Sequence, residues 1–330
     1  MTLGKNHLPR VNIVSWRREM QQGHSIVAEQ RKSLGKKPED FSGHARANLL
    51  YKPKNPGVFL MSEAAAVTQP TFLSVGTGES QRQIAISERA AGKGAKNVSF
   101  VWLSGYRSDM SGTKAVELDT LAERLGLGCI RFDYSGHGQS GGKFSDGTIS
   151  RWLEEALAVI DRTKPKRIVL VGSSMGGWIA LRVIQELRKR KKVPVIAGLV
   201  LIAPAPDFTI DLIEPNLSDM ERRSLAERGY FEEPSEYSSE PNIFTRALID
   251  DGRANRVLTG IIETGCPVHI LQGMEDADVP FAHSLKLVEH LPADDVVLTL
   301  VRDGDHRLSR PQDIERMLVA AETLALHNTP

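Results

Sequence analysis

The chain has 330 residues, of which 41% are hydrophobic and 25% are charged, and its net charge is +1. This is the composition of an ordinary globular protein that can bury a sizeable core. No run approaches the roughly 18 consecutive apolar residues of a membrane-spanning helix, and the N-terminus lacks the apolar segment of a secretory signal. We therefore expect a cytoplasmic protein without stable membrane insertion.

Two cysteines, Cys129 and Cys266, each open an apolar run, lie far apart in the sequence and form no C-x-x-C pair. Cysteine pairs at short spacing are typical of metal sites and redox motifs. We therefore predict that both residues are buried free thiols and that neither binds a metal.

Residues 1–60 differ in charge from the rest of the chain. They hold 11 Lys and Arg against 4 Asp and Glu, whereas the remainder holds 31 against 37. The segment contains four prolines and no sustained apolar period, so we predict a flexible tail before a single domain over 61–330. Met61 is an alternative start of the protein. Because the tail lacks interleaved aromatic residues and a compact basic block, we expect no nucleic-acid partner.

From residue 70 onward, short β-rich runs alternate with amphipathic stretches of helical length, which predicts an α/β protein with a mostly parallel sheet covered on both faces. The eight predicted strands are 71–75, 83–88, 98–103, 128–132, 167–171, 198–202, 268–272 and 296–301. The predicted helices are 113–125, 149–162, 176–190, 282–291 and 311–327. Because no helix separates the first two strands, we expect them to be antiparallel edge strands.

About sixty residues separate the predicted strands 198–202 and 268–272, far more than an ordinary connection needs. We call the segment 204–265 the insertion. It carries large aromatic and aliphatic side chains among many acids, and we predict two or three helices that cross the carboxyl edge of the sheet. A cap over a substrate pocket is the interpretation we prefer, and a structural addition away from the site is the alternative.

Gly172-Ser173-Ser174-Met175-Gly176 lies between the predicted strand 167–171 and the predicted helix 176–190. A nucleophilic serine is presented on a sharp strand-to-helix turn, where a side chain two residues before or after it would collide with its surroundings. Only Ser174 has glycine at both of these positions. We predict Ser174 as a nucleophile, with a plain Ser/Gly turn as the alternative.

A serine nucleophile needs an imidazole to take its proton and a carboxylate to support that imidazole. In doubly wound hydrolases the histidine follows the last strand, where this chain has His306. We predict His306 as the base, because the rival histidines lie within strands or helices or come too early in the chain: His137, His269, His283 and His290.

The carboxylate of such a triad follows a late strand. The loop after the predicted strand 268–272 carries Glu275, Asp276 and Asp278. We prefer Asp276, since its place in the middle of the turn should direct it toward the histidine, and Asp278 is the alternative.

The intermediate of acyl transfer also needs hydrogen-bond donors for its oxyanion. Met175 follows the nucleophile at the start of a predicted helix, and Tyr106 lies in the loop after the predicted strand 98–103. We predict that the backbone N–H groups of Tyr106 and Met175 form the oxyanion hole.

Five ordered blocks between residues 70 and 325 resemble the α/β-hydrolase superfamily, and within it the palmitoyl-protein thioesterase and acyl-glucuronide esterase group with its bacterial relatives. The blocks are GYRSDMSGTKA (105–115), CIRFDYSGHGQS (129–140), VGSSMGGW (171–178), GMED with VP (273–280) and DHR (305–307). The resemblance implies an α/β-hydrolase fold and the triad Ser174, Asp276 and His306. It also implies that 133–140 is a structural turn beside the site.

These observations predict a cofactor-independent serine hydrolase that cleaves carboxylic esters or thioesters through an acyl-enzyme. The expected partner is a small-molecule or acylated substrate, and short acyl esters, acyl thioesters and acyl glucuronides remain open. An exopeptidase or amidase on the same fold is one alternative, because amide cleavage uses the same triad. A non-catalytic ligand-binding protein is the other, because a fold does not guarantee activity.

Overall fold

The computed structural model describes residues 69–92, 97–191, 193–235, 241–291 and 295–326. All of them belong to the unit Ala64–Pro330. The tail predicted over 1–60 lies outside the described residues.

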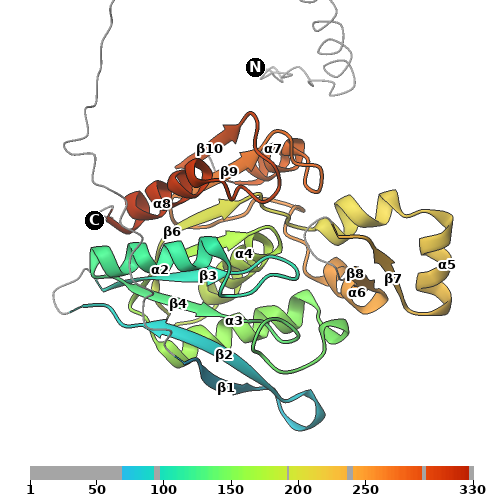
Figure 1. The fold of residues 1–330 in the computed structure, drawn as a ribbon, viewed down its shortest axis with the longest axis horizontal. Coiled ribbons are helices and arrows are strands. Elements are labelled where there is room, and N and C mark those ends of the chain that lie inside the picture. Colours follow the sequence, from blue (N-terminus) through green and yellow to red (C-terminus); the bar gives the residue numbers. More distant parts are fainter. Residues whose placement is uncertain (1–68, 93–96, 192, 236–240, 292–294, 327–330) are drawn as a thin grey trace, which may run out of the picture. The chain divides into compact units, whose positions relative to one another are not determined.

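Eight strands form one sheet in the order β1-β2-β4-β3-β5-β6-β9-β10 (Figure 1). They are β1 (Thr71–Val75), β2 (Arg82–Arg89), β3 (Val98–Leu103), β4 (Gly128–Phe132), β5 (Arg167–Ser173), β6 (Val195–Ile202), β9 (Val268–Gly273) and β10 (Val296–Val301). β2 pairs antiparallel with β1 and β4, and the other pairings in this sheet are parallel. The eight predicted strands and the antiparallel edge pair are confirmed.

Helices cover both faces of the sheet, as predicted (Figure 1). α2 (Thr113–Leu125) and α8 (Pro311–Leu326) pack against one face. α3 (Ile149–Thr163), α4 (Met175–Arg188) and α7 (Phe281–His290) pack against the other. At the elbow, β5 continues to Ser173 and α4 already begins at Met175, and β6 begins three residues before its predicted start.

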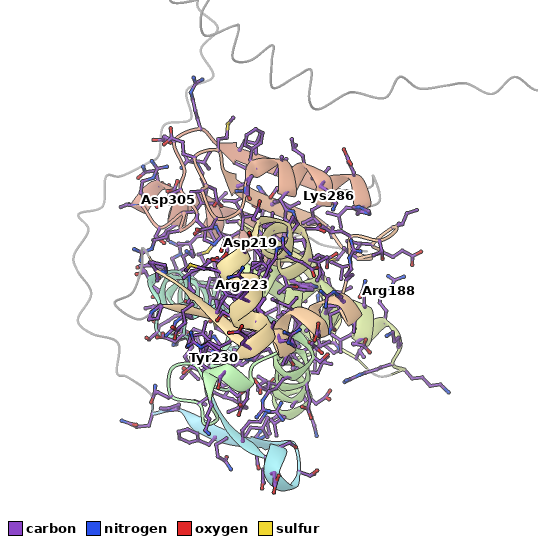
Figure 2. All side chains as sticks on the ribbon, turned by 90° about the vertical axis from the view of Figure 1, so that its right-hand side faces the viewer. Arg188, Asp219, Arg223, Tyr230, Lys286 and Asp305 are labelled. Atoms are coloured by element: carbon purple, nitrogen blue, oxygen red, sulfur yellow. The ribbon has the colours of Figure 1, made fainter. Side chains whose placement is uncertain are left out.

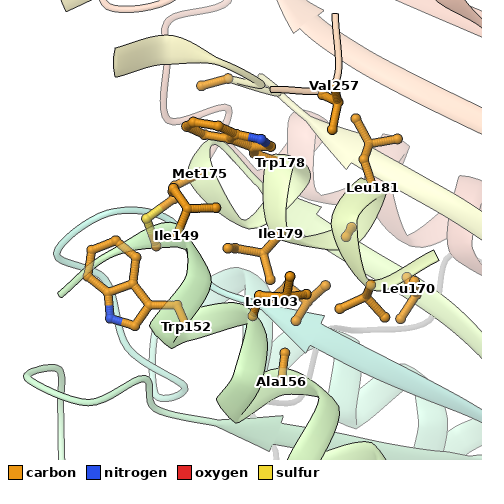
Figure 3. Close-up of a cluster of buried hydrophobic side chains, with 14 of the residues drawn as sticks. Leu103, Ile149, Trp152, Ala156, Leu170, Met175, Trp178, Ile179, Leu181 and Val257 are labelled. Atoms are coloured by element: carbon orange, nitrogen blue, oxygen red, sulfur yellow. The ribbon is translucent and has the colours of Figure 1, made fainter. Parts of the chain in front are cut away.

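The continuous apolar run of β5 is explained by its central position. Ile168, Val169, Leu170 and Val171 are fully buried, since a parallel strand with helices on both faces has no solvent side. Leu170 belongs to a buried cluster with side chains of α3 and α4, including Ala156, Ile179 and Leu181 (Figure 3). Complete burial of each such side chain stabilises the fold by about 1.5 to 3 kcal/mol. The buried core therefore holds the carboxyl end of β5 in place.

The insertion is only partly helical. It contains a π-helix (Thr209–Ile213), a short 3-10 turn (Glu214–Asn216), α5 (Asp219–Glu227), α6 (Arg246–Ala254) and an antiparallel hairpin of β7 (Tyr230–Glu233) and β8 (Asn242–Thr245). The prediction of helices alone is therefore wrong for this hairpin. Each strand has four residues, too few for alternation to show, and the buried pair Phe231 and Phe244 holds them together.

The insertion lies at one end of the sheet (Figure 1), and in the view toward that end it stands in front of the sheet, carrying Asp219, Arg223 and Tyr230 (Figure 2). Asp207 links the two ends of the insertion. The carboxylate of Asp207 is fully buried and accepts the N–H groups of Val257 at 2.8 Å and Leu258 at 2.9 Å. One side chain thereby joins the segment that enters the insertion to the segment that leaves it.

The two cysteines are free thiols. Cys129 is buried, and burial raises its pKa far above the ordinary range. Cys266 is only half-buried, so the prediction of two buried thiols is wrong for this residue.

Candidate active site

Ser174 lies between β5 and α4 with φ of 53° and ψ of −118°. A residue with a side chain is strained at positive φ and keeps this conformation only where its surroundings impose it. The Ser174 N–H donates to the carbonyl of Ile202 at 2.8 Å, and its own carbonyl accepts the N–H groups of Gly177 at 2.9 Å and Ala205 at 3.1 Å. These three backbone bonds hold the serine in the sharp turn that the motif predicts.

The glycines of the motif are required by close backbone contacts. A Cβ atom on Gly172 would lie 2.4 Å from the carbonyl oxygen of Gly176, and one on Gly176 would lie 1.9 Å from the carbonyl oxygen of Leu103. Gly105, in the loop after β3, is also close to the elbow, because its Cβ would lie 3.2 Å from the carbonyl oxygen of Ser173. The elbow can lie against the end of β3 because Gly172 and Gly176 lack side chains.

The structure brings together the three side chains that the sequence analysis grouped. His306, in the loop after β10, has Nε2 at 3.1 Å from Oγ of Ser174 and Nδ1 at 2.9 Å from Oδ2 of Asp276. The Asp276 side chain is fully buried, whereas the His306 side chain is 15% exposed. All three residues follow the carboxyl ends of parallel strands, which meet at one edge of the sheet.

Asp276 is surrounded by hydrogen-bond donors. Its Oδ1 accepts the N–H groups of Asp278 at 3.0 Å and Val279 at 2.7 Å, and its Oδ2 accepts from Nε2 of Gln272 at 3.0 Å. These donors fix the orientation of the carboxylate. Asp278 is exposed and contributes its backbone N–H to this arrangement. The carboxylate that accepts the hydrogen bond from His306 belongs to Asp276, the preferred acid.

Gln272 is a contributor that sequence analysis missed. Its side chain is buried at the end of β9, and Oγ of Ser284 donates to its Oε1 at 2.7 Å, which fixes the direction of the amide. The oriented amide N–H then points at Asp276. A polar residue at the end of a predicted central strand, four positions before Asp276, could have indicated this role. Its partner Ser284, however, lies on the helix that follows, and the two meet only in the folded chain.

Lys114 connects the His306 loop to α2. Its Nζ donates to the carbonyl of Arg307 and, at 3.1 Å, to Oγ of Ser309. Burial and the nearby Arg307 charge lower the pKa of Lys114 to about 8. The same loop is held from within, because the Leu308 N–H donates to the Asp305 carboxylate at 2.9 Å.

The two predicted oxyanion donors belong to the elbow and to the loop after β3. Met175 is the first residue of α4, where a backbone N–H has no acceptor within the helix, and its side chain is fully buried. The Tyr106 side chain packs beneath the hairpin of the insertion: its hydroxyl donates to the carbonyl of Ile243, and its ring stacks on Phe244 with centroids 5.3 Å apart. Burial raises the pKa of Tyr106 far above its ordinary value.

Several carboxylates lie near the loop that carries Asp276 and Asp278. Burial, together with the nearby charges of Glu221 and Asp278, raises the pKa of Glu233 at the end of β7.

The carboxylates of Asp276 and Asp278 and the imidazole of His306 form the one group of possible metal ligands in the described ranges whose ligand atoms lie within 4.8 Å of one another. Both Asp276 oxygens already accept protein donors, so this group does not present a cation site.

Residues 100–317 match the model of the alpha/beta hydrolase family, and this chain belongs to that family. It is 31% identical over 231 residues to the mitochondrial palmitoyl-protein thioesterase ABHD10 of Pongo abelii, which is 69% of this chain and 73% of that protein. The human protein of the same name is 30% identical over 230 residues, with 69% and 73% covered.

Solved structures agree with this fold. A crystal structure from Agrobacterium vitis S4, described in general terms as a hydrolase, is 68% identical with a TM-score of 0.76 and covers 78% of this chain and 98% of its own. Mouse alpha/beta hydrolase domain-containing protein 10 is 27% identical with a TM-score of 0.67, and the covered shares are also 78% and 98%. In the part of the chain that the structure describes, no helix has both the length and the apolar character to cross a membrane.

The elbow contacts predict that Gly176→Ala destabilises the protein by about 3 kcal/mol, because a new Cβ would overlap the Leu103 carbonyl and force the backbone to move. Gly260→Ala is the matched control, since no atom lies within 4 Å of a Cβ there, and we expect a change within about 0.5 kcal/mol. Urea unfolding of the wild type and both variants measures the free energies. Equal stability of the two variants would contradict the packing argument.

Proposed function

We propose that this protein is a serine hydrolase that cleaves carboxylic esters or thioesters through an acyl-enzyme. The observation that carries the proposal is the continuous chain of hydrogen-bond contacts from Ser174 through His306 to Asp276. Membership of the alpha/beta hydrolase family and the relatives named as thioesterases support hydrolysis of this type of bond.

The geometry supplies each step of acyl transfer. Oγ of Ser174 adds to the acyl carbon while its proton passes to Nε2 of His306, and the Asp276 carboxylate stabilises the imidazolium that forms. The C–O or C–S bond then breaks, and the leaving alkoxide or thiolate takes the proton from His306. Water attacks the acyl carbon in turn, gives a proton to His306, and Ser174 leaves with that proton. The reaction needs no cofactor.

We assign the oxyanion hole to the backbone N–H groups of Tyr106 and Met175. Both belong to segments in contact with the elbow, because Gly105 lies against Ser174 and Met175 follows it directly. One donor of this kind typically lowers the barrier by about 2.7 to 4 kcal/mol. Since both donors are main-chain groups, substitution of these two side chains does not remove them.

We propose that the insertion acts as a cap. It stands at the carboxyl end of the sheet, and its hairpin contacts Tyr106 beside the nucleophile. Aromatic side chains from the insertion and the core meet there: Phe208, Phe244, Phe144 and Trp152 all contact the Tyr106 ring. An apolar wall of this kind suits an acyl group. The names of the curated relatives make the thioester of an acylated protein one candidate substrate, and a cytoplasmic location stays a prediction.

The nucleophile assignment predicts that a fluorophosphonate probe labels the wild type but not Ser174→Ala, because the probe reacts only with an activated serine. Intact-protein mass spectrometry measures the labelling. Hydrolysis of acyl esters and of thioesters with the same acyl group should disappear together in the variant. Equal labelling of both proteins would refute the assignment. A wild type that turns over no acyl substrate, yet is stabilised by an acyl ligand, would instead indicate a binding protein.

The acid assignment predicts different effects for two neighbouring carboxylates. Asp276→Asn should lower kcat by about 10⁴-fold, because an amide cannot stabilise the imidazolium and favours the wrong tautomer of the histidine. Asp278→Asn should leave kcat close to the wild-type value, since Asp278 contributes its backbone N–H, which the substitution keeps. Steady-state kinetics on one acyl ester measures both. A larger loss for Asp278→Asn would transfer the role to that residue.

A further inference from the structure

His137 is a buried histidine that the triad does not use. It lies in the turn between β4 and α3 and is 6% exposed. Its Nδ1 is 3.1 Å from the carbonyl oxygen of Ser135, and its Nε2 is 3.2 Å from the backbone nitrogen of Arg107. A carbonyl only accepts and an N–H only donates, so the two contacts require a proton on Nδ1 and a lone pair on Nε2.

The surroundings keep this ring neutral. Burial lowers the pKa of His137 to about 4, and the charge of Arg107 acts in the same direction, against Asp109 and the bond to Ser135. At neutral pH the imidazole therefore carries one proton, and Nε2 stays free to accept.

The turn that carries His137 is rigid. The buried Asp133 carboxylate accepts the N–H groups of Met110 and Gln139, both at 2.7 Å. Glu155, paired with Arg82 at 2.6 Å in the core, accepts the N–H of Ser135 at 2.8 Å. Aromatic rings enclose the imidazole, with centroids at 5.0 Å for Phe144, 5.5 Å for Trp152 and 5.9 Å for Tyr134. The ring is thus an acceptor held in place by the core.

That loop is the one to which we assign an oxyanion donor. Arg107 directly follows Tyr106 and has a φ of 55°, so its peptide is held in a strained conformation. The bond to His137 fixes the peptide plane between the two residues, and with it the direction of the backbone at Tyr106. We propose that His137 is a positioning residue, which aims the Tyr106 N–H at the oxyanion through the backbone of Arg107. The proposal rests on the proposed hydrolase function.

The insertion contacts the same two residues from the other side. The Tyr106 hydroxyl donates to the carbonyl of Ile243, and the Arg107 guanidinium donates to the carbonyl of Pro241. Any movement of the hairpin therefore pulls on this loop through two side chains. His137 provides the opposing anchor on the side of the core.

The test compares two side chains of equal length. Gln at position 137 can place its amide oxygen near the position of Nε2, whereas Met has no comparable acceptor. We expect His137→Met to lower kcat by about 10- to 100-fold with little change in KM, and His137→Gln to recover most of that loss. The kcat is expressed per active site, titrated to completion with fluorophosphonate, so that unfolded protein does not contribute. A purely structural role would lower the number of sites and leave kcat per site unchanged.

Either of two kinetic results overturns the proposal: an unchanged kcat per site in His137→Met, or equal losses in both variants. A measurement on the wild type does not depend on how the variants fold. The ¹⁵N shifts of the imidazole at pH 7 should show a protonated Nδ1 and an unprotonated Nε2, and a proton on Nε2 would exclude the bond to Arg107. Failure of the proposed function looks different, because the wild type itself would then show no labelling and no turnover.

Discussion

The backbone of Ser174 is the constraint on which the site depends. Its positive φ turns the chain from the central strand into α4 within a single residue and leaves the hydroxyl beside His306. This conformation costs about 1 to 3 kcal/mol by itself. Three backbone hydrogen bonds offset the cost, and the absence of side chains at Gly172 and Gly176 lets the neighbouring strand and helix close around the turn. The sheet and its helices therefore hold Ser174 in its strained conformation.

Around this point, each loop of the site is held by one buried or half-buried polar side chain from a different element. Gln272 in β9 orients Asp276, Lys114 in α2 holds the loop of His306, and His137 holds the loop of Tyr106. None of the three contacts the proposed reacting atoms in the structure. They act on loops, which are otherwise the parts of a fold with the most freedom. We infer that the rigidity of the site comes from these cross-connections.

The sequence predicted the sheet well because local patterns decide it. The buried strand 98–103 and the helix 113–125 match the structure at both ends. The spacing of the glycines at 172 and 176 indicated the elbow, although the contact that requires Gly176 is with Leu103 of β3. The hairpin of β7 and β8 escaped prediction because it depends on the packing of Phe231 against Phe244. The roles of Gln272 and His137 escaped for the same reason, since Ser284 and Arg107 meet them only in the folded chain.

We propose that the elbow presents the Ser174 hydroxyl to the His306 imidazole, and that the backbone N–H groups of Tyr106 and Met175 receive the oxyanion of the intermediate. The most direct measurement is a crystal structure of the protein after reaction with a dialkyl nitrophenyl phosphate, a phosphotriester that loses nitrophenol when it reacts with serine. We expect one phosphorus atom bound to Oγ of Ser174, with its non-ester oxygen about 2.7 to 3.1 Å from the backbone nitrogens of both Tyr106 and Met175. Phosphorus on another residue, or that oxygen directed to solvent, would contradict this proposal.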